Sequence, residues 1–460
     1  MDLQLSVEAY DRSTTGGALE ILQNMYSEQQ PETDGRGHTL LSGPGITAYR
    51  NGYLGGNVRG FLAKDGLFDG DIFSVHGTNV YRTDSAGVQT LLGSVPASGL
   101  VTIAASRNEV LVCVDPGLYS YNGVDFIPVV LPGFGVSSIA YIAQRFVGSS
   151  NSIDRWYWSD LLDGRTWDGL NFKTAEGEAD KAVRVYTTPQ YVVVFGTEST
   201  EVYGLNANPR TPADTFYRIS TGAMAHGLLA PLSVAKEGAF IFWLSNKKNI
   251  FVASGFRPNK ISTPYEQDLL DSLTDAELAG ALGYSYTQRG HTFFVFTVPN
   301  KFTLTYDLGN QKWQIRKTLG GLSWRAELGI KAFGKVIAAN TNSADLFEID
   351  LDAKTDLGVP IVQEFTVSIP VRAPLVLEDL TIDMWSDTAG FMAMKFTQTG
   401  GRGAWTSFVD ARMSAPSYED TQVMWRDLGT ARAPERIQRF RISDPANVMV
   451  RGARANDGID

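Results

Sequence analysis

The chain has 460 residues, of which 43% are hydrophobic and 20% charged, close to the averages of soluble globular proteins. It has a formal net charge of −10 and no run of basic residues, which argues against the basic face that tight, non-specific nucleic-acid binding requires. Its single cysteine excludes an intrachain disulfide, and abundant glycine and aromatic residues favour an all-β fold with many turns.

Residues 1–48 form the first predicted segment, an extended arm that closes the next domain or reaches a neighbouring chain. The arm is rich in glycine and proline, which favour irregular structure. Within it, residues 18–26 are predicted as a short helix. The opening residues lack the basic and apolar parts of a signal peptide, and no stretch of the chain is long and apolar enough to span a membrane. We therefore expect cytoplasmic synthesis without membrane insertion.

Residues 49–352 contain paired strand-like runs that alternate apolar and polar residues, the pattern of half-buried strands. Short polar turns such as Asp115-Pro116-Gly117 separate the two runs of a pair. The pairs recur every ~30–55 residues, near the length of one propeller blade. They are 71–75 with 80–82, 109–114 with 118–121, 140–148 with 156–158, 191–195 with 200–203, 239–243 with 250–253, 292–297 with 303–307, and 335–340 with 346–349.

A lone hairpin cannot bury both of its faces, so several hairpins must pack against one another. Radial packing gives a β-propeller with six or seven blades over residues 49–352. A row of β-sandwiches is the alternative, and the regular spacing of the hairpins favours the propeller. Cys113 lies in one apolar run and is predicted to be a buried strand residue.

A small helical insertion interrupts the strands near 263–282. Thr263 can cap a helix whose first turn contains Pro264, and Thr274 with Glu277 forms a second capping box. We predict helices at 264–272 and 275–282. Their apolar residues should face the propeller, with contact to a partner as the alternative; these are Leu269, Leu270, Leu273 and Leu278.

Residues 353–460 are predicted to form a C-terminal antiparallel β-sandwich. A linker at 352–358 precedes them. The alternating segments are 362–369, 377–385, 392–399 and 437–442. The polar tail at 453–460 is expected to be frayed.

A search for reactive groups finds little. The histidines, His38, His76, His226 and His291, have neither the spacing nor the cysteine neighbours of a zinc site, so no metal is expected. His76 and His291 are instead expected at hairpin ends. No phosphate-binding loop or serine elbow occurs, and no cofactor is expected.

The best enzyme candidate is a set of carboxylates, since two of them at short distance can hydrolyse a glycoside. Residues 163–167 are similar to the Asp-box of sialidases, but Asp163 and Gly164 are adjacent and Leu161 occupies the serine position. A folded-back turn with Trp167 packed on a blade is the favoured interpretation. The set is Asp160, Asp163, Asp168, Glu176, Glu178 and Asp180.

The aromatic run Trp156-Tyr157-Trp158 has two possible uses. In a strand, Trp156 and Trp158 share one face and Tyr157 lies on the other. Such rings can stack on sugars or bases, but packing between blades explains them equally well and is favoured.

Several blocks of the chain are grouped, in chain order, at 24–26, 44–47, 158–177, 193–203, 227–236, 242–244 and 260–266. Together they resemble the packaged-DNA stabilisation proteins of short-tailed phages over about residues 20–320; those are tail hub or nozzle proteins. The resemblance rests on the order of the blocks, includes 227–236 and 242–244, and fades after about 350. The other matching positions are Asn24, Tyr26, Pro44, Gly45, Trp158, Asp160, Asp163, Gly164, Thr166, Trp167, Phe172, Glu176, Phe195, Gly196, Thr200, Glu201, Ile261, Ser262, Thr263 and Glu266.

This resemblance implies a structural protein of the virion tail, made in the cytoplasm of the bacterial host and without enzymatic activity. It implies a homo-oligomeric, hexameric ring below the portal and its adaptor, the head–tail connector. Implied partners are tailspikes or tail fibres, the tail needle or plug, and passing double-stranded DNA that is not read by sequence. The matching residues are then scaffold and interface positions. Because a duplex carries one charge per ~1.7 Å, we expect neutral or acidic loops along the ring's channel.

Two other functions remain open at this point. The first is a propeller glycoside hydrolase, similar to a depolymerase or sialidase, that acts on host surface glycan and needs convergent carboxylates in one pocket. The second is a cellular binding module with one concave face.

Overall fold

The computed structural model describes residues 1–15, 18–30, 37–150, 152–175, 180–398, 400–414 and 421–456. It contains two compact units. The propeller unit comprises Ala48–Tyr286 and Ala326–Glu348, and the sandwich unit comprises Met1–Thr47, Thr287–Arg325 and Ile349–Asp460. The division of the sequence into an arm, a propeller and a C-terminal sandwich stays a prediction.

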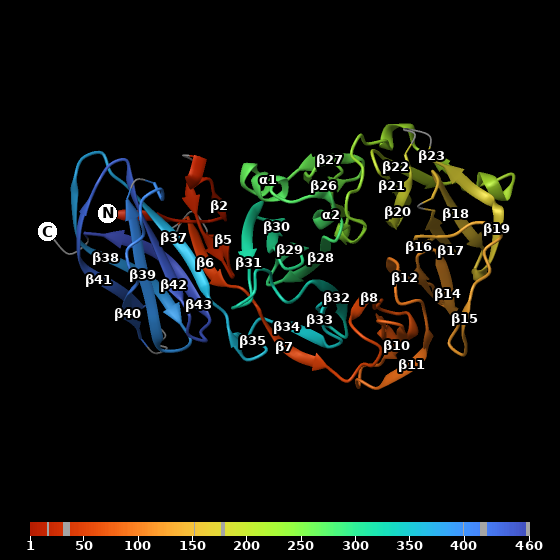
Figure 1. The fold of residues 1–460 in the computed structure, drawn as a ribbon, viewed down its shortest axis with the longest axis horizontal. Coiled ribbons are helices and arrows are strands. Elements are labelled where there is room, and N and C mark those ends of the chain that lie inside the picture. The colour runs from red at the N-terminus through yellow and green to blue at the C-terminus, as the bar shows by residue number, and fades with distance from the viewer. Residues whose placement is uncertain are drawn as a thin grey trace. The chain divides into compact units, whose positions relative to one another are not determined.

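Five antiparallel four-stranded sheets follow one another in the propeller unit, numbered here as the first to fifth blades (Figure 1). They are β8 (Val58–Leu62), β9 (Ile72–His76), β10 (Asn79–Thr83) and β11 (Gln89–Ser94); β12 (Val101–Ala105), β13 (Val110–Val114), β14 (Gly117–Tyr121) and β15 (Phe126–Pro128); β16 (Ser138–Ile142), β17 (Arg145–Ser149), β18 (Arg155–Asp160) and β19 (Asp163–Thr174); β20 (Ala182–Thr187), β21 (Tyr191–Gly196), β22 (Thr200–Leu205) and β23 (Phe216–Arg218); and β24 (Ala235–Glu237), β25 (Phe240–Leu244), β26 (Ile250–Ser254) and β27 (Arg257–Lys260).

A sixth set of four strands closes the propeller unit. It has the order β32 (Leu328–Ala332), β33 (Lys335–Ala339), β34 (Leu346–Asp350) and β7 (Gly45–Arg50), so its outer strand comes from early in the chain. A further inner strand, β28 (Leu282–Gln288), lies between the fifth blade and β32 in sequence. The predicted all-β fold with a propeller, a sandwich and a helical insertion is confirmed.

Tight turns join the strands within a blade. The run 140–148, expected as one strand, is two strands, β16 and β17. Ala143 and Gln144 have φ values of 48° and 62° and turn the chain between them. Two successive residues with positive φ form the hairpin turn whose twist matches that of paired strands.

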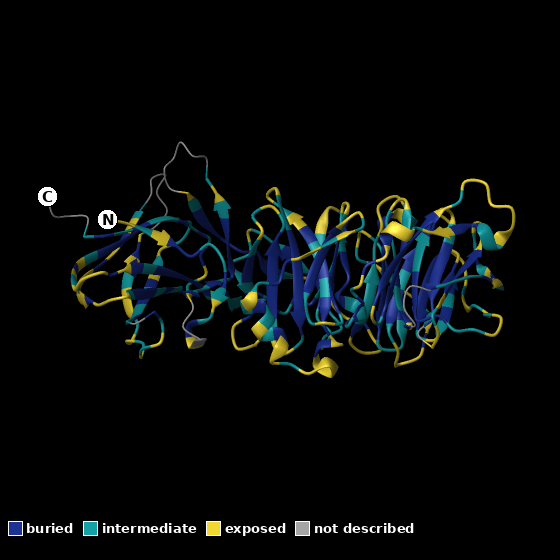
Figure 2. Cartoon of the chain, turned by 90° about the horizontal axis from the view of Figure 1, so that it is seen from above, coloured by how far each residue is buried: buried dark blue, intermediate teal, exposed yellow. Residues whose placement is uncertain are grey.

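Apolar cores lie between consecutive blades, because each sheet buries both faces against its neighbours. Figure 2 shows the buried strands and the exposed loops. The core between the third and fourth blades contains Trp156, Trp158 and Phe216, and the core between the second and third contains Cys113 and Tyr157. The predicted burial of Cys113 and the opposite faces of the aromatic run are therefore confirmed.

The helical insertion follows the fifth blade. Helix α1 (Pro264–Asp271) begins at the predicted cap, and α2 (Asp275–Leu278) is shorter than the expected 275–282. Of the four leucines expected to face the propeller, Leu270 and Leu278 are fully buried, whereas Leu269 and Leu273 are only half-buried.

Two antiparallel sheets enclose the core of the sandwich unit. One has the order β1, β43, β38 and β41, with β6 and β5 paired onto β43; the other has β40, β39, β42 and β37, with β1 and β4 paired onto β37. Their bounds are β1 (Asp2–Leu5), β4 (Leu22–Gln23), β5 (Met25–Gln29), β6 (His38–Ser42), β37 (Gln363–Pro370), β38 (Leu375–Ser386), β39 (Gly390–Gln398), β40 (Val409–Met413), β41 (Thr421–Ala431), β42 (Glu435–Ile442) and β43 (Val448–Ala455).

Smaller elements complete this unit. Strands β29 to β31 form a meander, and β31 pairs in parallel with β4. The bounds are β2 (Tyr10–Asp11), β3 (Leu19–Glu20), β29 (His291–Val298), β30 (Phe302–Asp307), β31 (Lys312–Arg316), β35 (Thr355–Asp356) and β36 (Val359–Pro360). Five short 3₁₀ turns are described, one in this unit at 13–15 and four in the propeller unit at 68–70, 212–214, 220–222 and 231–233.

Three local predictions about this unit are wrong. Residues 18–26 form strands β3, β4 and the start of β5, because pairing with β37 and a positive φ of 57° at Asn24 override helix formation. Within the expected linker at 352–358, Thr355 and Asp356 form β35, which pairs with β36 beyond it, and Asp356 is 2% exposed. The tail is paired through Ala455, which is buried; residues 457–460 lie outside the described part.

Candidate functional site

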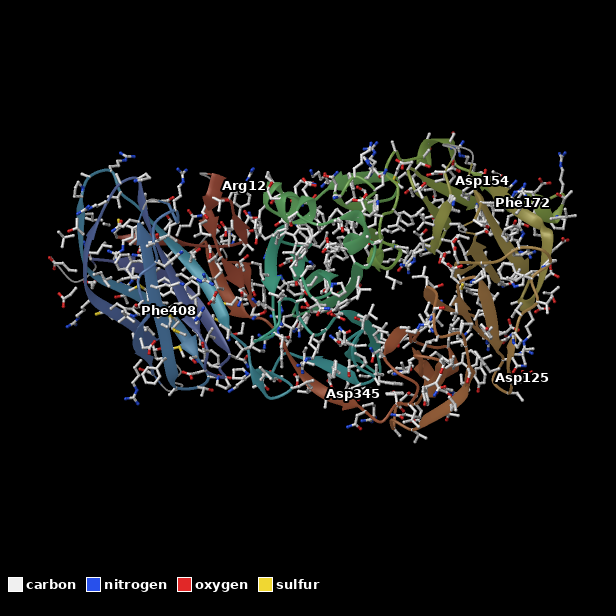
Figure 3. All side chains as sticks on the ribbon, in the orientation of Figure 1. Arg12, Asp125, Asp154, Phe172, Asp345 and Phe408 are labelled. Atoms are coloured by element: carbon white, nitrogen blue, oxygen red, sulfur yellow. The ribbon has the colours of Figure 1, made fainter. Side chains whose placement is uncertain are left out.

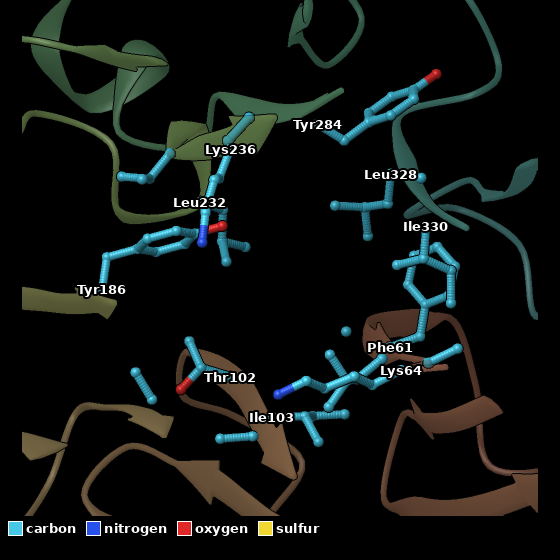
Figure 4. Close-up of a pocket in the computed structure, with 18 of the residues that line it drawn as sticks. Phe61, Lys64, Thr102, Ile103, Tyr186, Leu232, Lys236, Tyr284, Leu328 and Ile330 are labelled. Carbon is cyan, nitrogen blue, oxygen red and sulfur yellow. The ribbon is translucent and has the colours of Figure 1, made fainter. Parts of the chain in front are cut away.

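A cavity of about 700 Å³ occupies the centre of the propeller unit (Figure 4). Residues of seven inner strands line it, namely β8, β12, β16, β20, β24, β28 and β32. Its wall carries five cationic side chains and two anionic ones, a balance opposite to that of the whole chain. The charged lining residues are Arg59, Lys64, Asp65, Arg184, Lys236, Glu237 and Lys331.

The two arginines of this wall are bound to the protein itself. The Arg59 guanidinium donates to the carbonyl oxygens of Gly77 at 2.7 Å and Gly99 at 2.8 Å. Arg184 donates to the carbonyl oxygen of Pro231, and its guanidinium lies 5.4 Å from the ring centroid of Tyr186. Both side chains therefore brace the ends of neighbouring blades.

Two lysines project into the cavity itself, as Figure 4 shows for Lys64 and Lys236. Lys236 Nζ donates to the carbonyl oxygen of Thr187 at 3.3 Å, and Lys64 Nζ lies 5.9 Å from the ring centroid of Tyr141. Burial lowers the pKa of Lys236, the positive charge of Lys64 lowers it further, and Glu237 opposes both. The two ammonium groups thus repel each other in a confined space.

The third-blade motif forms a folded-back turn. Asp163 Oδ1 accepts hydrogen bonds from the backbone amides of Arg165 at 2.8 Å and Thr166 at 3.2 Å, and Oδ2 accepts one from the Thr166 hydroxyl at 2.8 Å. Trp167 Nε1 donates to the carbonyl oxygen of Gly164 at 2.8 Å. The Asp163 carboxylate is thereby occupied in holding the turn.

The same motif joins two blades. The amide of Gly164 donates to Glu109 Oε2 at 2.6 Å, and Arg165 pairs with Asp125 at 2.8 Å. Asp125 and Phe172 are labelled in Figure 3, and the Arg155 guanidinium lies 4.3 Å from the Phe172 ring centroid. These contacts fix the outer strand of the third blade against the second.

The four candidate aspartates that the structure describes do not meet in the central cavity. Asp168 Oδ1 accepts from the amide of Leu170 at 2.9 Å, and Asp180 Oδ2 accepts from the amides of Glu198 at 2.7 Å and Ser199 at 2.8 Å. Asp160 is exposed on the hairpin opposite Asp163. None of these aspartates lines the central cavity, and Glu176 and Glu178 lie outside the described residues.

Trp158 lies in the core between the third and fourth blades. It is fully buried, and its ring centroid lies 5.2 Å from that of Phe216 in an edge-to-face arrangement. Trp156 contacts Tyr203 in a similar way at 4.9 Å. Both tryptophans are covered by the next blade, so no ligand can stack on them.

The fourth-blade residues make contacts within and beyond their sheet. Glu201 is 1% exposed and accepts from Arg218 at 2.7 Å and from the Tyr203 hydroxyl at 2.6 Å. The Thr200 hydroxyl donates to the carbonyl oxygen of His226 at 2.7 Å. The Phe195 ring centroid lies 5.7 Å from that of Trp243 in the fifth blade, and a Cβ at Gly196 would lie 2.3 Å from an Asp180 oxygen.

The Ile-Ser-Thr element connects the fifth blade to α1. The Ser262 hydroxyl accepts from the amide of Ile250 at 3.2 Å, and Ile261 is buried. Glu266 is fully buried and accepts from the amide of Thr263 at 2.7 Å, which completes the capping box. This element therefore sets where the helix starts.

The N-terminal family positions lie in the sandwich unit. Asn24 donates to the carbonyl oxygens of Lys317 at 2.9 Å and Val362 at 2.8 Å, and it accepts from the amide of Lys317 at 2.9 Å. It thus ties together three distant parts of the chain.

The other N-terminal positions pack tightly. The Tyr26 ring centroid lies 5.1 Å from that of His291, and Arg316 donates to the carbonyl oxygen of Pro44. A Cβ at Gly45 would lie 2.5 Å from the carbonyl oxygen of Ala353, so a larger residue has no room.

Within the described ranges, no group of three or more potential metal ligands is found. His76 ends β9 and His291 begins β29, so both lie at hairpin ends as predicted. Burial lowers the pKa of His76 to about 4, whereas a hydrogen bond from His291 to Asp307 raises the pKa of His291. Of the helices described, none is long and apolar enough to cross a lipid bilayer.

The sequence analysis did not identify the cationic cavity. Lys64 and Lys236 are far apart in the chain, and each is an ordinary lysine beside an inner strand. Only the arrangement of the inner strands around one centre brings the two side chains to the same cavity, so no local pattern in the sequence indicates it.

Comparisons with known proteins match most of the chain to one family. A family model described as bacteriophage P22 Gp10, beta-propeller, matches residues 7–354. No curated protein sequence matches the chain.

Solved structures give weaker similarity. The N-terminal part of BBS1 in complex with ARL6 matches with a TM-score of 0.43 at 9% identity, covering 66% of this chain and 96% of that one. BamB from Moraxella catarrhalis matches with a TM-score of 0.42 at 10% identity, covering 72% and 96%. The WD40 propeller domain of Doa1 matches with a TM-score of 0.40 at 11% identity, covering 66% and 97%.

Proposed function

Because the chain belongs to the family of bacteriophage stabilisation proteins with a β-propeller, and is therefore a phage structural protein and a virion component, we propose that it is a subunit of the tail hub, or nozzle. In this role a ring of copies, six by our proposal, lies below the portal and its adaptor. The ring retains packaged DNA, carries tailspikes or fibres and the needle or plug, and later conducts the DNA outward.

The observation that carries this proposal is the use of the family positions. The charged and polar groups of the motif bind backbone amides and neighbouring blades, as Asp163 and Glu109 do. These carboxylates are thus engaged in holding a turn and in joining two blades. These contacts make the propeller a rigid scaffold, and a rigid scaffold is suited to a mechanical role in the virion.

An exposed aliphatic patch supports assembly with another protein. Val124 is 90% exposed, Val130 85% and Leu170 74%. Val124 and Val130 flank β15 of the second blade, and Leu170 lies in β19 of the third blade. The Arg165–Asp125 pair joins these two parts of the chain. Contiguous exposed apolar side chains mark protein–protein contact sites. We assign this aliphatic patch, Val124, Val130 and Leu170, to contact with a neighbouring copy in the ring.

The test is a phage that lacks a functional gene for this chain, grown with and without a plasmid that supplies it. Without the chain, particles should package DNA and then lose it, measured as nuclease-sensitive DNA per assembled head. The supplied wild-type chain should restore retention. Full retention and infectivity without the chain would overturn the proposal.

Variants of the aliphatic patch refine this test. When the double variant Val130→Asp/Leu170→Asp is supplied, DNA retention should be at least tenfold lower than with the wild-type chain. Leu54→Asp, at a 71% exposed residue of the same unit, should restore retention fully.

Incubation of the purified chain with host surface polysaccharide tests the alternative function, a glycoside hydrolase. Sugar release that Asp163→Asn abolishes would support a hydrolase instead.

A further inference from the structure

We propose that the central cavity of the propeller unit binds a small polyphosphate anion, free or as part of a nucleotide, between Lys64 and Lys236. This site lies inside one propeller and does not depend on the proposed role in the tail.

The charge of the cavity wall is the first argument. Five cationic and two anionic side chains line one cavity in a chain whose net charge is −10. A concave site with low-dielectric walls concentrates the field of its charges and attracts ions of the opposite sign. The positive charges of the cavity wall therefore favour the binding of a small anion there.

The second argument is that the two lysines have unused donors. An ammonium group has three donors, and the one hydrogen bond given for Lys236 goes to Thr187. In the described part of the chain, no carboxylate pairs with Lys64 or Lys236 within ion-pair distance. Mutual repulsion between the two ammonium groups would be relieved by an anion placed between them.

The type of cation selects the type of anion. Planar arginine forks recognise carboxylates and phosphates in pairs of hydrogen bonds, but Arg59 and Arg184 are bound to backbone carbonyl oxygens, which leaves the lysines as the available cations. Lysines act as compact point charges that suit phosphate oxygens. Because Lys64 and Lys236 project from different strands, a ligand charged along its length can bridge them.

The cavity also has room and a further donor. A volume of about 700 Å³ lies within the range of small-molecule sites. Burial raises the pKa of Tyr186, so its phenol keeps the proton and can donate to a phosphate oxygen. The Tyr186 ring lines the same wall as Lys236 and offers an apolar face to a base.

The experiment is calorimetric titration of the purified full chain with tripolyphosphate, ATP, adenosine and citrate. Tripolyphosphate and ATP should bind and adenosine should not. Equal affinities for tripolyphosphate and ATP would mean that the site recognises the polyphosphate alone. ATP binding at least tenfold tighter than tripolyphosphate binding would mean that the ligand is a nucleotide. Citrate binding as tight as tripolyphosphate, or no binding of either phosphate ligand, would overturn the proposal.

Variants locate the site. Lys64→Met and Lys236→Met keep side-chain length and remove the charge, and each should weaken tripolyphosphate binding at least tenfold. Lys247→Met, at an exposed lysine outside the cavity, should leave it unchanged. Thermal melting of each variant checks folding, and Lys64→Gln and Lys236→Gln replace any variant that unfolds. Unchanged affinity in folded variants of both lysines would refute the site, whatever the result of the DNA-retention test.

Discussion

Glu109 and Gly164 are joined by a hydrogen bond of 2.6 Å from the Gly164 amide to the Glu109 carboxylate. The bond crosses from the second blade to the third, two sheets that the Arg165–Asp125 ion pair and apolar packing also join. Glu109 is 8% exposed, and its carboxylate lies where a side chain at position 164 would have to go.

Gly164→Ala should destabilise the propeller. The added Cβ would lie 2.5 Å from Glu109 Oε2 and 2.7 Å from Leu111 Cδ1. Overpacking of this kind costs about 1–3 kcal/mol in the free energy of unfolding, measured by urea denaturation. Gly280→Ala is the matched control, because its nearest neighbour would be 3.7 Å away. Equal stability of the two variants would contradict the proposed role of this contact.

Trp158→Ala should be more damaging, because it opens a void between the third and fourth blades. Removal of a fully buried tryptophan costs about 3–5 kcal/mol. Tyr217→Ala, at a side chain 53% exposed, should change the free energy of unfolding by less than about 1 kcal/mol. The comparison is made by thermal and chemical denaturation, and a small loss for Trp158→Ala would mean that the core is less closely packed than described.

Asn24→Ala should lower the free energy of unfolding more than Asn300→Ala does. The comparison separates the contribution of side-chain hydrogen bonds from that of backbone strain. Asn24 has a φ of 57° and Asn300 one of 58°, but only Asn24 is buried. Alanine at either position should cost about 1 kcal/mol for the left-handed conformation. Loss of the Asn24 hydrogen bonds to Lys317 and Val362 should add about 1–3 kcal/mol, because their partners become unsatisfied. Similar losses in the two variants would contradict this.

His76 should make the protein less stable in mild acid. Its folded pKa is lowered to about 4 from 6.5, so below pH 6.5 the unfolded chain takes up a proton that the folded chain refuses. Stability therefore falls as pH decreases through this window, by up to about 3 kcal/mol, and the fall stops below the folded pKa.

His76→Phe tests this by keeping the stacked contact with Tyr53, whose ring centroid lies 4.0 Å away, and removing the titration. The variant loses the hydrogen bond to Ser74, so its stability at neutral pH is its own reference. Denaturation curves at several pH values should show a shallower acid loss for the variant. An identical slope would mean that His76 is protonated in the folded protein.

Local patterns in the sequence were sufficient to predict most strands of the propeller and the hairpin turns between them. The alternation at 191–195 and 200–203 predicted β21 and β22 because half-buried strands repeat every two residues. The Thr263 capping box likewise predicted the start of α1, since its bonds join residues close in the chain. Fold class and helix starts could be read for this reason.

Long-range contacts decided the rest. Residues 18–26 became strands because β37 and β31 pair with them, and neither partner is near in sequence. The family positions were named from the sequence, but their bonds to distant backbone, such as Asn24 to Lys317, were not readable there.

The sequence by itself determined most strands of the propeller, the hairpin turns such as 115–117, and that the chain has one cysteine and an excess of acidic residues. Tertiary structure alone decided that Gly164 faces Glu109 and that Lys64 and Lys236 project into one cavity. The physical reason is that turns and alternation depend on neighbours in the chain, whereas the meeting of side chains depends on how the blades close around a common centre.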